Sequence, residues 1–323
     1  MKLIICKMNK QKKITSDHSI LPAFLIVIAA SLWGVDGIVL RPALYSLPVV
    51  VVVFIESSIV AVLLTPLLIK NFNVLKRLSR KDWLAYAGVA LLGGAVGTMA
   101  ITKALFYVNF VNLSIIILLQ KLQPVFAISL AAMFLKEKLH KEFFFWAALA
   151  IVGAYLMTFG FTIPDFNAGD KTTVAALFAL LAALSFSSST VLSKRALLNV
   201  SFELGTYLRF AISSIIMLVI MIGSGDTKSI QSVSSYQAMI FLIIAFTTGG
   251  PAIFLYYYGL KRITASVATI CELAFPLTAI VLEYFIRGNI LGPVQWIGAV
   301  VLLVSIIRVI KINSNSLQKN STD

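Results

Sequence analysis

The sequence predicts an all-α, polytopic membrane protein whose ten transmembrane helices form a 5+5 inverted repeat. Three observations support this fold class: the composition, the spacing of the apolar runs and a repeat between the two halves. The chain has 323 residues, of which 59% are hydrophobic and only 12% charged, and its mean hydropathy is +0.96. Because about 25% of a typical soluble domain is charged, this chain is expected to lie in a lipid bilayer.

Ten apolar runs are long enough to cross a bilayer, since a spanning helix needs about 20 mostly apolar residues. They lie at 20–40, 47–69, 83–105, 109–135, 143–161, 173–194, 203–222, 236–259, 263–286 and 291–311. The lysine-rich start resembles a signal peptide, but no small-residue cleavage site follows it, so the first helix is expected to be retained. The predicted parts are a basic tail (1–19), a first five-helix repeat (20–161), a linker (162–172), a second five-helix repeat (173–311) and a C-terminal tail (312–323).

Basic residues indicate the orientation of the spans, because cytoplasmic loops carry an excess of Lys and Arg. Most of the 27 basic residues lie in the tails and in alternate loops on one side. The other side holds only Arg41, Lys171, Lys228 and Arg287. Both termini are therefore predicted to be cytoplasmic, in the cytoplasmic (inner) membrane. This distribution also explains the net charge of +14 without a nucleic-acid partner.

A shift of 152 residues superposes the two halves without gaps and aligns Gly97 with Gly249 and Pro124 with Pro276. The glycine and the proline are informative because their backbone roles do not follow from hydrophobicity. Five spans per half is an odd number, so the second half should be inserted upside down relative to the first. Inverted repeats of this kind place a binding site near the bilayer midplane.

The two aligned prolines indicate where that site lies. A proline inside a helix frees the carbonyl four residues earlier, which here belongs to Gln120 or Glu272. Each kink would combine an unpaired carbonyl with a polar side chain, and Lys121 and Gln123 lie beside the first. Irregular backbone at this depth occurs only where it lines a cavity or is buried in protein. A structural kink satisfied by neighbouring helices is the alternative.

Six charged residues lie inside apolar runs, where a charge costs about 2.5 to 3.5 kcal/mol and usually faces a wet cavity or another charge. A transport pathway is therefore expected, with Asp36, Glu56, Lys103, Lys121, Arg209 and Glu272 as candidates. Glu56 and Arg209 could pair with each other or with Asp36 and Lys121. Lys103 could instead snorkel to the outer surface. Glu272 is the candidate partner of a coupling proton or an ammonium group.

Aromatic and serine residues complete the predicted substrate site. Trp33 could stack on a planar substrate, although it would also suit a membrane interface. Phe186 and Ser187 belong to a serine-rich patch that could bind a ligand or allow close helix packing. Tyr257 is the middle of three adjacent tyrosines, of which one or two at most can face a cavity. The predicted hinge residues are Pro124, Pro276, Gly249 and Pro251.

Over residues 20–311 the chain resembles the EamA-like ten-helix carriers of the drug/metabolite transporter superfamily. The resemblance rests on the duplication, the Trp33–Gly34 pair, the Leu-Lys-Glu-Lys-Leu stretch at 135–139 after the proline, and the stretch 288–299. It implies a secondary carrier that moves small organic metabolites by alternating access.

Two departures from the family pattern limit what the resemblance implies. Glu137 matches an acid that commonly ends the fourth helix in the family, whereas its second-half counterpart is Asn289. The family also tends to carry an arginine in the second helix, where this chain has Glu56. A substrate is therefore not carried over from a relative that lacks this glutamate.

The mixed charges of Asp36, Lys121 and Glu272 suit a zwitterion better than a strong anion. An amino acid or derivative is the first expected substrate, and a nucleotide sugar or adenosylated compound is the alternative. A membrane enzyme acting on lipid is the competing class, disfavoured because no His or Asp/Glu cluster lies at a membrane face. No enzyme activity, cofactor or metal is expected. The expected partners are a small-molecule substrate, the lipid bilayer and a coupling proton or counter-substrate, with a homodimer left open.

Overall fold

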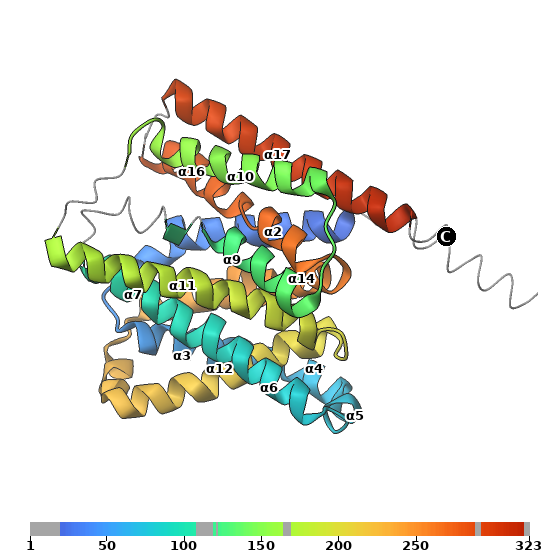
Figure 1. Ribbon diagram of the computed structural model, residues 1–323. Helices are drawn as coiled ribbons and strands as arrows, with labels where there is room; N and C mark the ends of the chain where they lie inside the picture. Colours follow the sequence, from blue (N-terminus) through green and yellow to red (C-terminus); the bar gives the residue numbers. More distant parts are fainter. Residues whose placement is uncertain (1–19, 108–118, 121, 164–168, 288–291, 320–323) are drawn as a thin grey trace, which may run out of the picture.

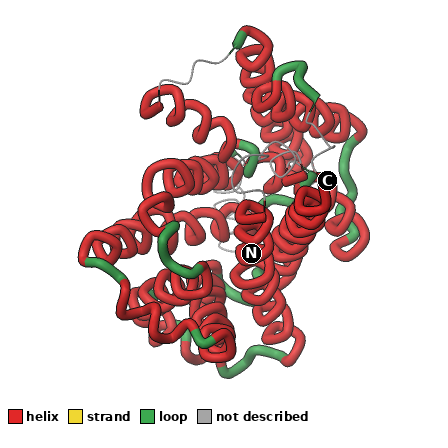
Figure 2. The backbone as a smooth tube through the Cα atoms, turned by 90° about the vertical axis from the view of Figure 1, so that its left-hand side faces the viewer, coloured by secondary structure: helices red, strands yellow, loops and turns green. Residues whose placement is uncertain are grey.

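The computed structural model describes residues 20–107, 119–120, 122–163, 169–287 and 292–319 (Figure 1). Within these ranges all regular structure is helical, as the sequence predicts, and the elements are joined by short loops (Figure 2). Large apolar side chains remain exposed on the outside of the bundle, including those of Leu84, Phe145, Val219 and Phe285. Such a surface is expected where helices face lipid, so the chain is an all-α polytopic membrane protein.

The described residues contain eight helical segments that are long and apolar enough to cross a bilayer. They are Leu21–Leu44, Arg80–Ile101, Lys141–Phe159, Thr173–Ala196, Phe202–Ser224, Ser235–Arg262, Ala265–Ile286 and Pro293–Ser314. Two shorter apolar segments, Val49–Leu63 and Gln123–Leu135, lie in the second and fourth predicted spans. The first part of the fourth predicted span lies outside the described residues, so the count of ten full spans stays a prediction.

Several predicted spans are divided into shorter elements. The first half contains α2 (Leu21–Val35), η1 (Asp36–Leu40), η2 (Arg41–Leu44), α3 (Val49–Leu63), α4 (Thr65–Lys70), α5 (Phe72–Leu75), α6 (Arg80–Val89), η3 (Ala90–Val96), α7 (Gly97–Tyr107), α9 (Gln123–Leu130), η4 (Ala131–Leu135) and α10 (Lys141–Phe159). The second contains α11 (Gly169–Ala196), α12 (Phe202–Ser224), η5 (Asp226–Ser232), α13 (Ser235–Ile244), η6 (Ala245–Gly249), α14 (Gly250–Arg262), α15 (Ala265–Cys271), α16 (Ala274–Arg287) and α17 (Pro293–Lys319). Helix α17 therefore continues into the predicted C-terminal tail.

Short polar caps fix where several helices begin. Ser79 and Asp82 form a reciprocal capping box at the start of α6, and Ser234 and Gln237 form another at the start of α13. Thr264 accepts a hydrogen bond from the backbone N–H of Val267 and so caps α15. Each cap satisfies N–H groups that have no partner inside the helix.

The ninth predicted span is interrupted next to the candidate site. Helix α15 ends at Cys271 and α16 begins at Ala274, so Glu272 lies in the break between them. The prediction that the Glu272 carbonyl is unpaired is wrong, because it accepts the backbone N–H of Phe275 at 3.0 Å. A tight turn has replaced the expected kink, and this turn supplies the donor that the proline at 276 lacks.

Two π-helical segments lie at corresponding positions of the two halves. The segment η3 ends just before Gly97, and η6 ends at Gly249, the residue that the repeat aligns with Gly97. A π segment inserts an extra residue per turn and frequently occurs at functional sites. Both segments contribute residues to the cavity described below.

The helix contacts reflect the internal repeat, because a contact in one half has a counterpart in the other half. Helix α2 packs against α14 and α16, and the corresponding α11 packs against α7 and α9. Helix α3 packs against α12, and α10 lies along α17 (Figure 1). This symmetry supports the predicted duplication, while the inverted orientation and the domain boundaries stay predictions.

The α10–α17 pair is held together by a close approach of two backbones. A Cβ added to Gly298 would lie 2.3 Å from the backbone nitrogen of Met157 and 2.8 Å from the carbonyl oxygen of Gly153. Backbone atoms in a helix cannot move aside as a flexible side chain can. Small residues are the usual means by which membrane helices approach this closely.

We therefore expect Gly298→Ala to lower the free energy of unfolding by about 1 to 3 kcal/mol, the usual effect of overpacking. The measurement is thermal unfolding of the purified protein in detergent. Gly223→Ala in α12 is the matched control, because a Cβ there meets nothing within 4 Å. Equal melting temperatures for the two variants would contradict the packing argument.

Candidate functional site

A cavity of about 650 Å³ lies between helices of both halves. Its volume falls within the range of about 300 to 1,000 Å³ that is typical of small-molecule sites. Aromatic side chains form part of its wall: Trp33, Tyr45, Phe186, Phe210, Tyr256 and Phe275. Polar and charged side chains supply the rest, including Asp36, Arg41, Glu56, Gln120, Gln123, Thr190, Arg209, Thr248, Thr269 and Glu272.

The structure brings many of the predicted site residues to this cavity. The lining includes six of the predicted substrate-binding residues: Trp33, Asp36, Gln120, Gln123, Phe186 and Glu272. It also includes three of the predicted hinge residues: Pro124, Gly249 and Pro276. Residues from sequence positions far apart thus meet at one site.

Other predicted residues lie elsewhere. Ser187 and Tyr257 are buried behind the lining, where the Ser187 hydroxyl donates to the Gln123 carbonyl at 2.8 Å. Lys103 is exposed and its Nζ lies 5.8 Å from the centre of the Phe178 ring, a position that matches the snorkelling alternative. Pro251 is exposed at the start of α14. Lys121 lies outside the described residues.

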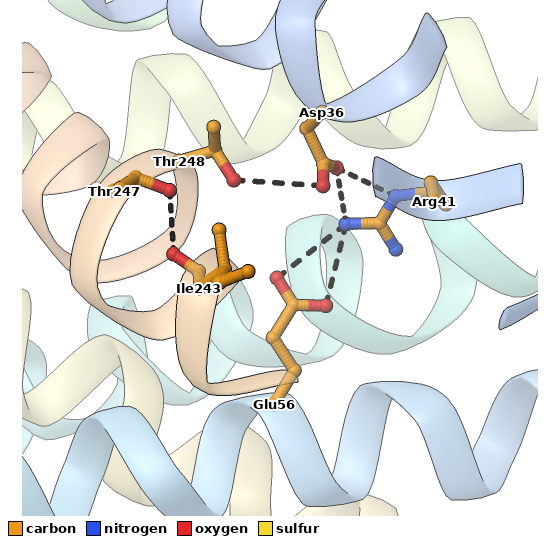
Figure 3. Close-up of polar contacts among 6 residues, drawn as sticks. All are labelled: Asp36, Arg41, Glu56, Ile243, Thr247 and Thr248. Carbon is orange, nitrogen blue, oxygen red and sulfur yellow. Dashed lines mark hydrogen bonds and ion pairs between the residues drawn. The ribbon is translucent and has the colours of Figure 1, made fainter. Parts of the chain in front are cut away.

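A cluster of three charged side chains, called the ion cluster below, joins the first two apolar segments (Figure 3). Arg41 donates from Nε to Oδ2 of Asp36 at 2.6 Å and from Nη2 to Oε2 of Glu56 at 3.3 Å. The Thr248 hydroxyl of η6 donates to Oδ1 of Asp36 at 3.5 Å. One guanidinium therefore serves two carboxylates within the membrane region.

The local backbone explains how Arg41 reaches Asp36. The backbone N–H of Arg41 bonds the carbonyl of Asp36, five residues earlier, which is a π-helical turn. An α-helical turn would place residue 40 above Asp36 instead, because its bonds join residues four apart. The extra residue of the π turn brings the two side chains together.

Arg41 is the functional residue that sequence reasoning missed. It was assigned to the outer loops, whereas its side chain points inward and takes the place proposed for Arg209 or Lys121 as the partner of Glu56. A signal did exist, since Asp36 inside a span needs a partner and Arg41 is the nearest base along the chain. The five-residue separation concealed it, because ordinary helices pair residues three or four apart.

A second group, called the amide–carboxylate cluster below, surrounds Glu272 in the break between α15 and α16. Its Oε1 accepts the Tyr256 hydroxyl at 2.7 Å, and its Oε2 accepts Nε2 of Gln123 at 3.0 Å. The Tyr256 oxygen also lies 3.1 Å from the Thr190 hydroxyl. The ring centres of Trp33 and Tyr256 are 5.3 Å apart, so an aromatic wall adjoins this cluster.

Arg209 lines the same cavity without a carboxylate partner among the described residues. Its Nη1 donates to the Tyr257 hydroxyl at 3.4 Å, and that hydroxyl lies 3.0 Å from Oγ of Ser193. A guanidinium has five N–H donors in a fixed fork. Among the described residues the Tyr257 hydroxyl accepts one of these donors, so most of the guanidinium's donor capacity has no protein acceptor there.

A carboxylate cap joins the two halves at the end of the bundle that is predicted to be cytoplasmic. Lys136 adopts a left-handed backbone conformation (φ 54°) that ends η4 and directs Glu137 toward α15. The Glu137 carboxylate accepts the backbone N–H of Ala265 at 2.7 Å and both the N–H and the hydroxyl of Ser266, at 3.1 and 2.6 Å. A negative group at a helix N-terminus is stabilising, so this contact joins the two halves.

A lysine reinforces the same end. Nζ of Lys194 donates to the carbonyls of Leu260 at 2.8 Å and Ile263 at 2.6 Å, at the C-terminus of α14. At the other end, the cavity lining reaches Tyr45 and Leu47, in the connection between η2 and α3. The described lining is therefore closer to the end that is predicted to face outward.

Comparisons with known proteins agree with this architecture. A sequence profile of the EamA-like transporter family matches residues 20–159 and 173–310. The riboflavin transporter ImpX of Fusobacterium nucleatum is 46% identical over 298 residues, which cover 92% of this chain and 100% of that protein. The uncharacterized transporter sll1164 of Synechocystis is 25% identical over 73% of this chain and 68% of its own length.

A solved crystal structure with 15% sequence identity covers 90% of this chain and 96% of its own, with a TM-score of 0.71. Likeness at this identity concerns the fold alone. The chain belongs to the EamA-like transporter family, as its sequence resemblance indicated. It is accordingly a small-molecule transporter and not an enzyme.

The ion cluster generates a prediction about stability. Arg41→Gln would leave Asp36 and Glu56 facing each other without a counter-charge, and removing one partner of a buried ion pair costs about 3 to 5 kcal/mol. We expect thermal unfolding of the purified protein to show this loss, and Arg41→Gln/Glu56→Gln to recover part of it. Arg77→Gln removes the same charge from an exposed arginine and should stay within about 0.5 kcal/mol. Equal losses in the single and double variants would contradict the cluster.

Proposed function

We propose that this transporter carries riboflavin, or a flavin that shares its ring and polyol chain, across the membrane by alternating access. The observation that supports the proposal most directly is the similarity to a riboflavin transporter over that protein's full length. The character of the cavity supports it independently, because both its aromatic and its polar surfaces match the chemistry of a flavin.

Riboflavin combines a planar heteroaromatic ring system with a chain of hydroxyl groups. Trp33, Tyr256 and Phe186 offer aromatic surface to such a ring, and aromatic pairs gain energy beyond the area that they bury. Amide, hydroxyl and charged groups in the same cavity can hydrogen-bond the heteroatoms and the chain. Convergent polar groups in a largely apolar cavity are the usual form of a small-molecule site.

The expected amino-acid substrate has no support from the relatives. Its physical argument used the mixed charges of Asp36, Lys121 and Glu272, and Arg41 now compensates the first of these carboxylates. A flavin is closer to the nucleotide-like alternative, because both present a heteroaromatic ring joined to a hydroxylated chain. We therefore propose a flavin in place of the amino acid.

Alternating access requires that the closed end opens while the other end closes. In the described residues the Glu137 cap on α15 and the Lys194 contacts on α14 hold one end. The breaks in the helices at η3, η6 and between α15 and α16 lie at the cavity. Irregular backbone can absorb a change of angle with less loss of hydrogen bonding than a continuous helix can, so these breaks are the proposed hinges.

The proposed function predicts saturable uptake of labelled riboflavin into proteoliposomes that contain the purified protein. Excess unlabelled riboflavin should compete, and a mixture of amino acids should not. Protein-free liposomes give the background, and an imposed pH gradient tests the expected coupling proton. Uptake of amino acids, with no flavin binding or uptake, would overturn the proposal.

A pair of variants tests whether the aromatic wall takes part. Trp33→Ala should reduce uptake strongly because it removes the ring beside Tyr256, whereas Trp33→Phe should retain most of it. Stacking of a base on an aromatic side chain is worth about 1 to 3 kcal/mol, and only the alanine variant loses this contribution entirely. Uptake that is equal in both variants would show that ring stacking at this position contributes nothing.

The Glu137 cap on α15, the proposed gate, predicts a change in the accessibility of the Cys271 thiol. Cys271 is buried at the end of α15, between the Glu137 cap and Glu272, so it reports on opening of this end. In a Cys6→Ser background, Glu137→Ala should accelerate maleimide labelling of Cys271 several-fold. Glu142→Ala removes an exposed acid at the start of α10 and should leave the rate unchanged. Equal labelling rates in the two variants would contradict the gate.

A further inference from the structure

The two polar clusters of the cavity lie at different heights in the membrane. Helix α14 and the preceding η6 connect them, because Thr248 bonds Asp36 in the ion cluster and Tyr256 bonds Glu272 in the amide–carboxylate cluster. Eight residues separate Thr248 from Tyr256, which corresponds to about 12 Å of helical rise. A ligand that is elongated, with a different polar group at each end, can therefore touch both clusters.

The amide–carboxylate cluster has hydrogen-bonding capacity that its own residues do not use. Glu272 accepts the Tyr256 hydroxyl and the Gln123 amide and has the Thr190 hydroxyl as a third neighbour, whereas a carboxylate offers about four lone-pair sites. Gln123 uses one of its two amide N–H groups on Glu272, and among the described residues its side chain has no other partner. The cluster can therefore accept one further bond and donate another.

An unpartnered buried hydroxyl lies one turn away. Thr269 is 1% exposed and lines the cavity, and its Oγ1 has no hydrogen-bond partner among the described residues. A buried hydroxyl without a partner is costly, so such a group usually meets a ligand or an ordered water. Thr269 precedes Glu272 by three residues, and Arg209 adds a second donor on the cavity wall.

This arrangement is complementary to one edge of the flavin ring. The imide edge presents a carbonyl, an N–H and a second carbonyl in sequence, that is, an acceptor, a donor and an acceptor. Glu272 is an acceptor, Gln123 donates to it, and Thr269 and Arg209 add donor groups to the same cavity lining. Hydrogen bonds to an ionised group are about twice as strong as neutral ones, so with Glu272 in its ionised form the contact between N3–H and the carboxylate would dominate.

The ion cluster is suited to the other part of the ligand. Hydroxyl groups both donate and accept, so a chain of them can donate to carboxylate oxygens and accept from a guanidinium. Asp36, Arg41 and Glu56 present both kinds of group within one contact network. Because their charges are already compensated in part by one another, a neutral polyol can bind without bringing a counter-ion.

We propose that Gln123 and Glu272 bind the imide edge of the flavin ring and that the Asp36–Arg41–Glu56 cluster binds its ribityl hydroxyls. This assignment rests on the proposed function and gives it an orientation, in which the ring lies toward the Trp33–Tyr256 wall. The carrier then selects its substrate by the imide group at one end and the hydroxyl chain at the other.

The first test compares riboflavin with N3-methylriboflavin, which lacks the imide N–H and is otherwise the same molecule. The dissociation constant of each for the purified full-length protein in detergent is measured by quenching of flavin fluorescence. Because a hydrogen bond to a charged group is worth about 1.5 to 3 kcal/mol, the methylated ligand should bind roughly 10- to 100-fold more weakly. Equal dissociation constants would overturn the imide assignment.

Variants then identify the side chain that accepts the hydrogen bond from the imide N–H. In Glu272→Gln the preference for riboflavin over N3-methylriboflavin should fall to within about 3-fold, since the bond to a charged acceptor is gone. Glu142→Gln is the matched comparison, because it makes the same change at an exposed acid at the start of α10, away from the cavity. That variant should keep the preference. A preference unchanged in Glu272→Gln would overturn the assignment to this carboxylate.

Thr269→Val gives a milder version of the same test, because it keeps the shape of the side chain and removes only its unpartnered hydroxyl. It should weaken riboflavin binding several-fold without lowering the melting temperature. Should Glu272→Gln fail to fold, this variant and the wild-type ligand comparison still decide the outcome. Unchanged binding in Thr269→Val together with equal binding of the two flavins would end the proposal.

The second arm uses lumiflavin, which has the ring but no hydroxyl chain. Asp36→Asn should weaken riboflavin binding at least 5-fold and change lumiflavin binding less than 2-fold, with thermal unfolding confirming that the variant is folded. Equal weakening of both ligands would overturn the ribityl assignment and leave the imide assignment standing. If the wild-type protein neither binds nor transports riboflavin, the proposed function itself fails, so the two failures are distinguishable.

Discussion

The constraint on which this structure depends is the absence of water from the hydrocarbon core of the bilayer. A polar group left unpaired there costs several kcal/mol, so every charge inside a span must find a partner or face a cavity. The described charges follow this rule. Arg41 compensates Asp36 and Glu56, Glu272 accepts two donors, and Lys103 is exposed with its ammonium near an aromatic ring.

The sequence was sufficient for the parts of the fold that depend on composition and repetition. Apolar run lengths gave the helical class and the approximate spans. The aligned prolines led to Gln120 and Glu272, with Gln123 beside the first, and the side chains of Gln123 and Glu272 do meet at the cavity although the Glu272 carbonyl is paired. Each of these inferences uses a property that a residue has regardless of its neighbours, such as the missing N–H of proline. They therefore did not require knowledge of which helices touch.

The remaining features depend on contacts that no local pattern encodes. The π turn that brings Arg41 over Asp36 differs from an α turn by one residue, and Glu56 from α3 completes the network around the guanidinium. Among the three adjacent tyrosines, Tyr256 lines the cavity and Tyr257 is buried behind it. In a helix that is apolar on all sides, the face that meets the cavity is set by packing, so the sequence could not choose between them.

Helix α15 connects the closed end of the carrier with the ligand site. Its first residue, Ala265, donates its N–H to Glu137, and its last residue directly precedes Glu272. A seven-residue helix is about 10 Å long. With α15 moving as a rigid unit in the proposed cycle, a shift of Glu272 toward a bound ligand would also shift the N–H groups that Glu137 caps. A ligand can change the balance between two states only by as much as its affinities for them differ. In the proposed cycle, ligand contacts at Glu272 would therefore act on the Glu137 cap through α15. Contacts at Asp36 would act through α2 and η6.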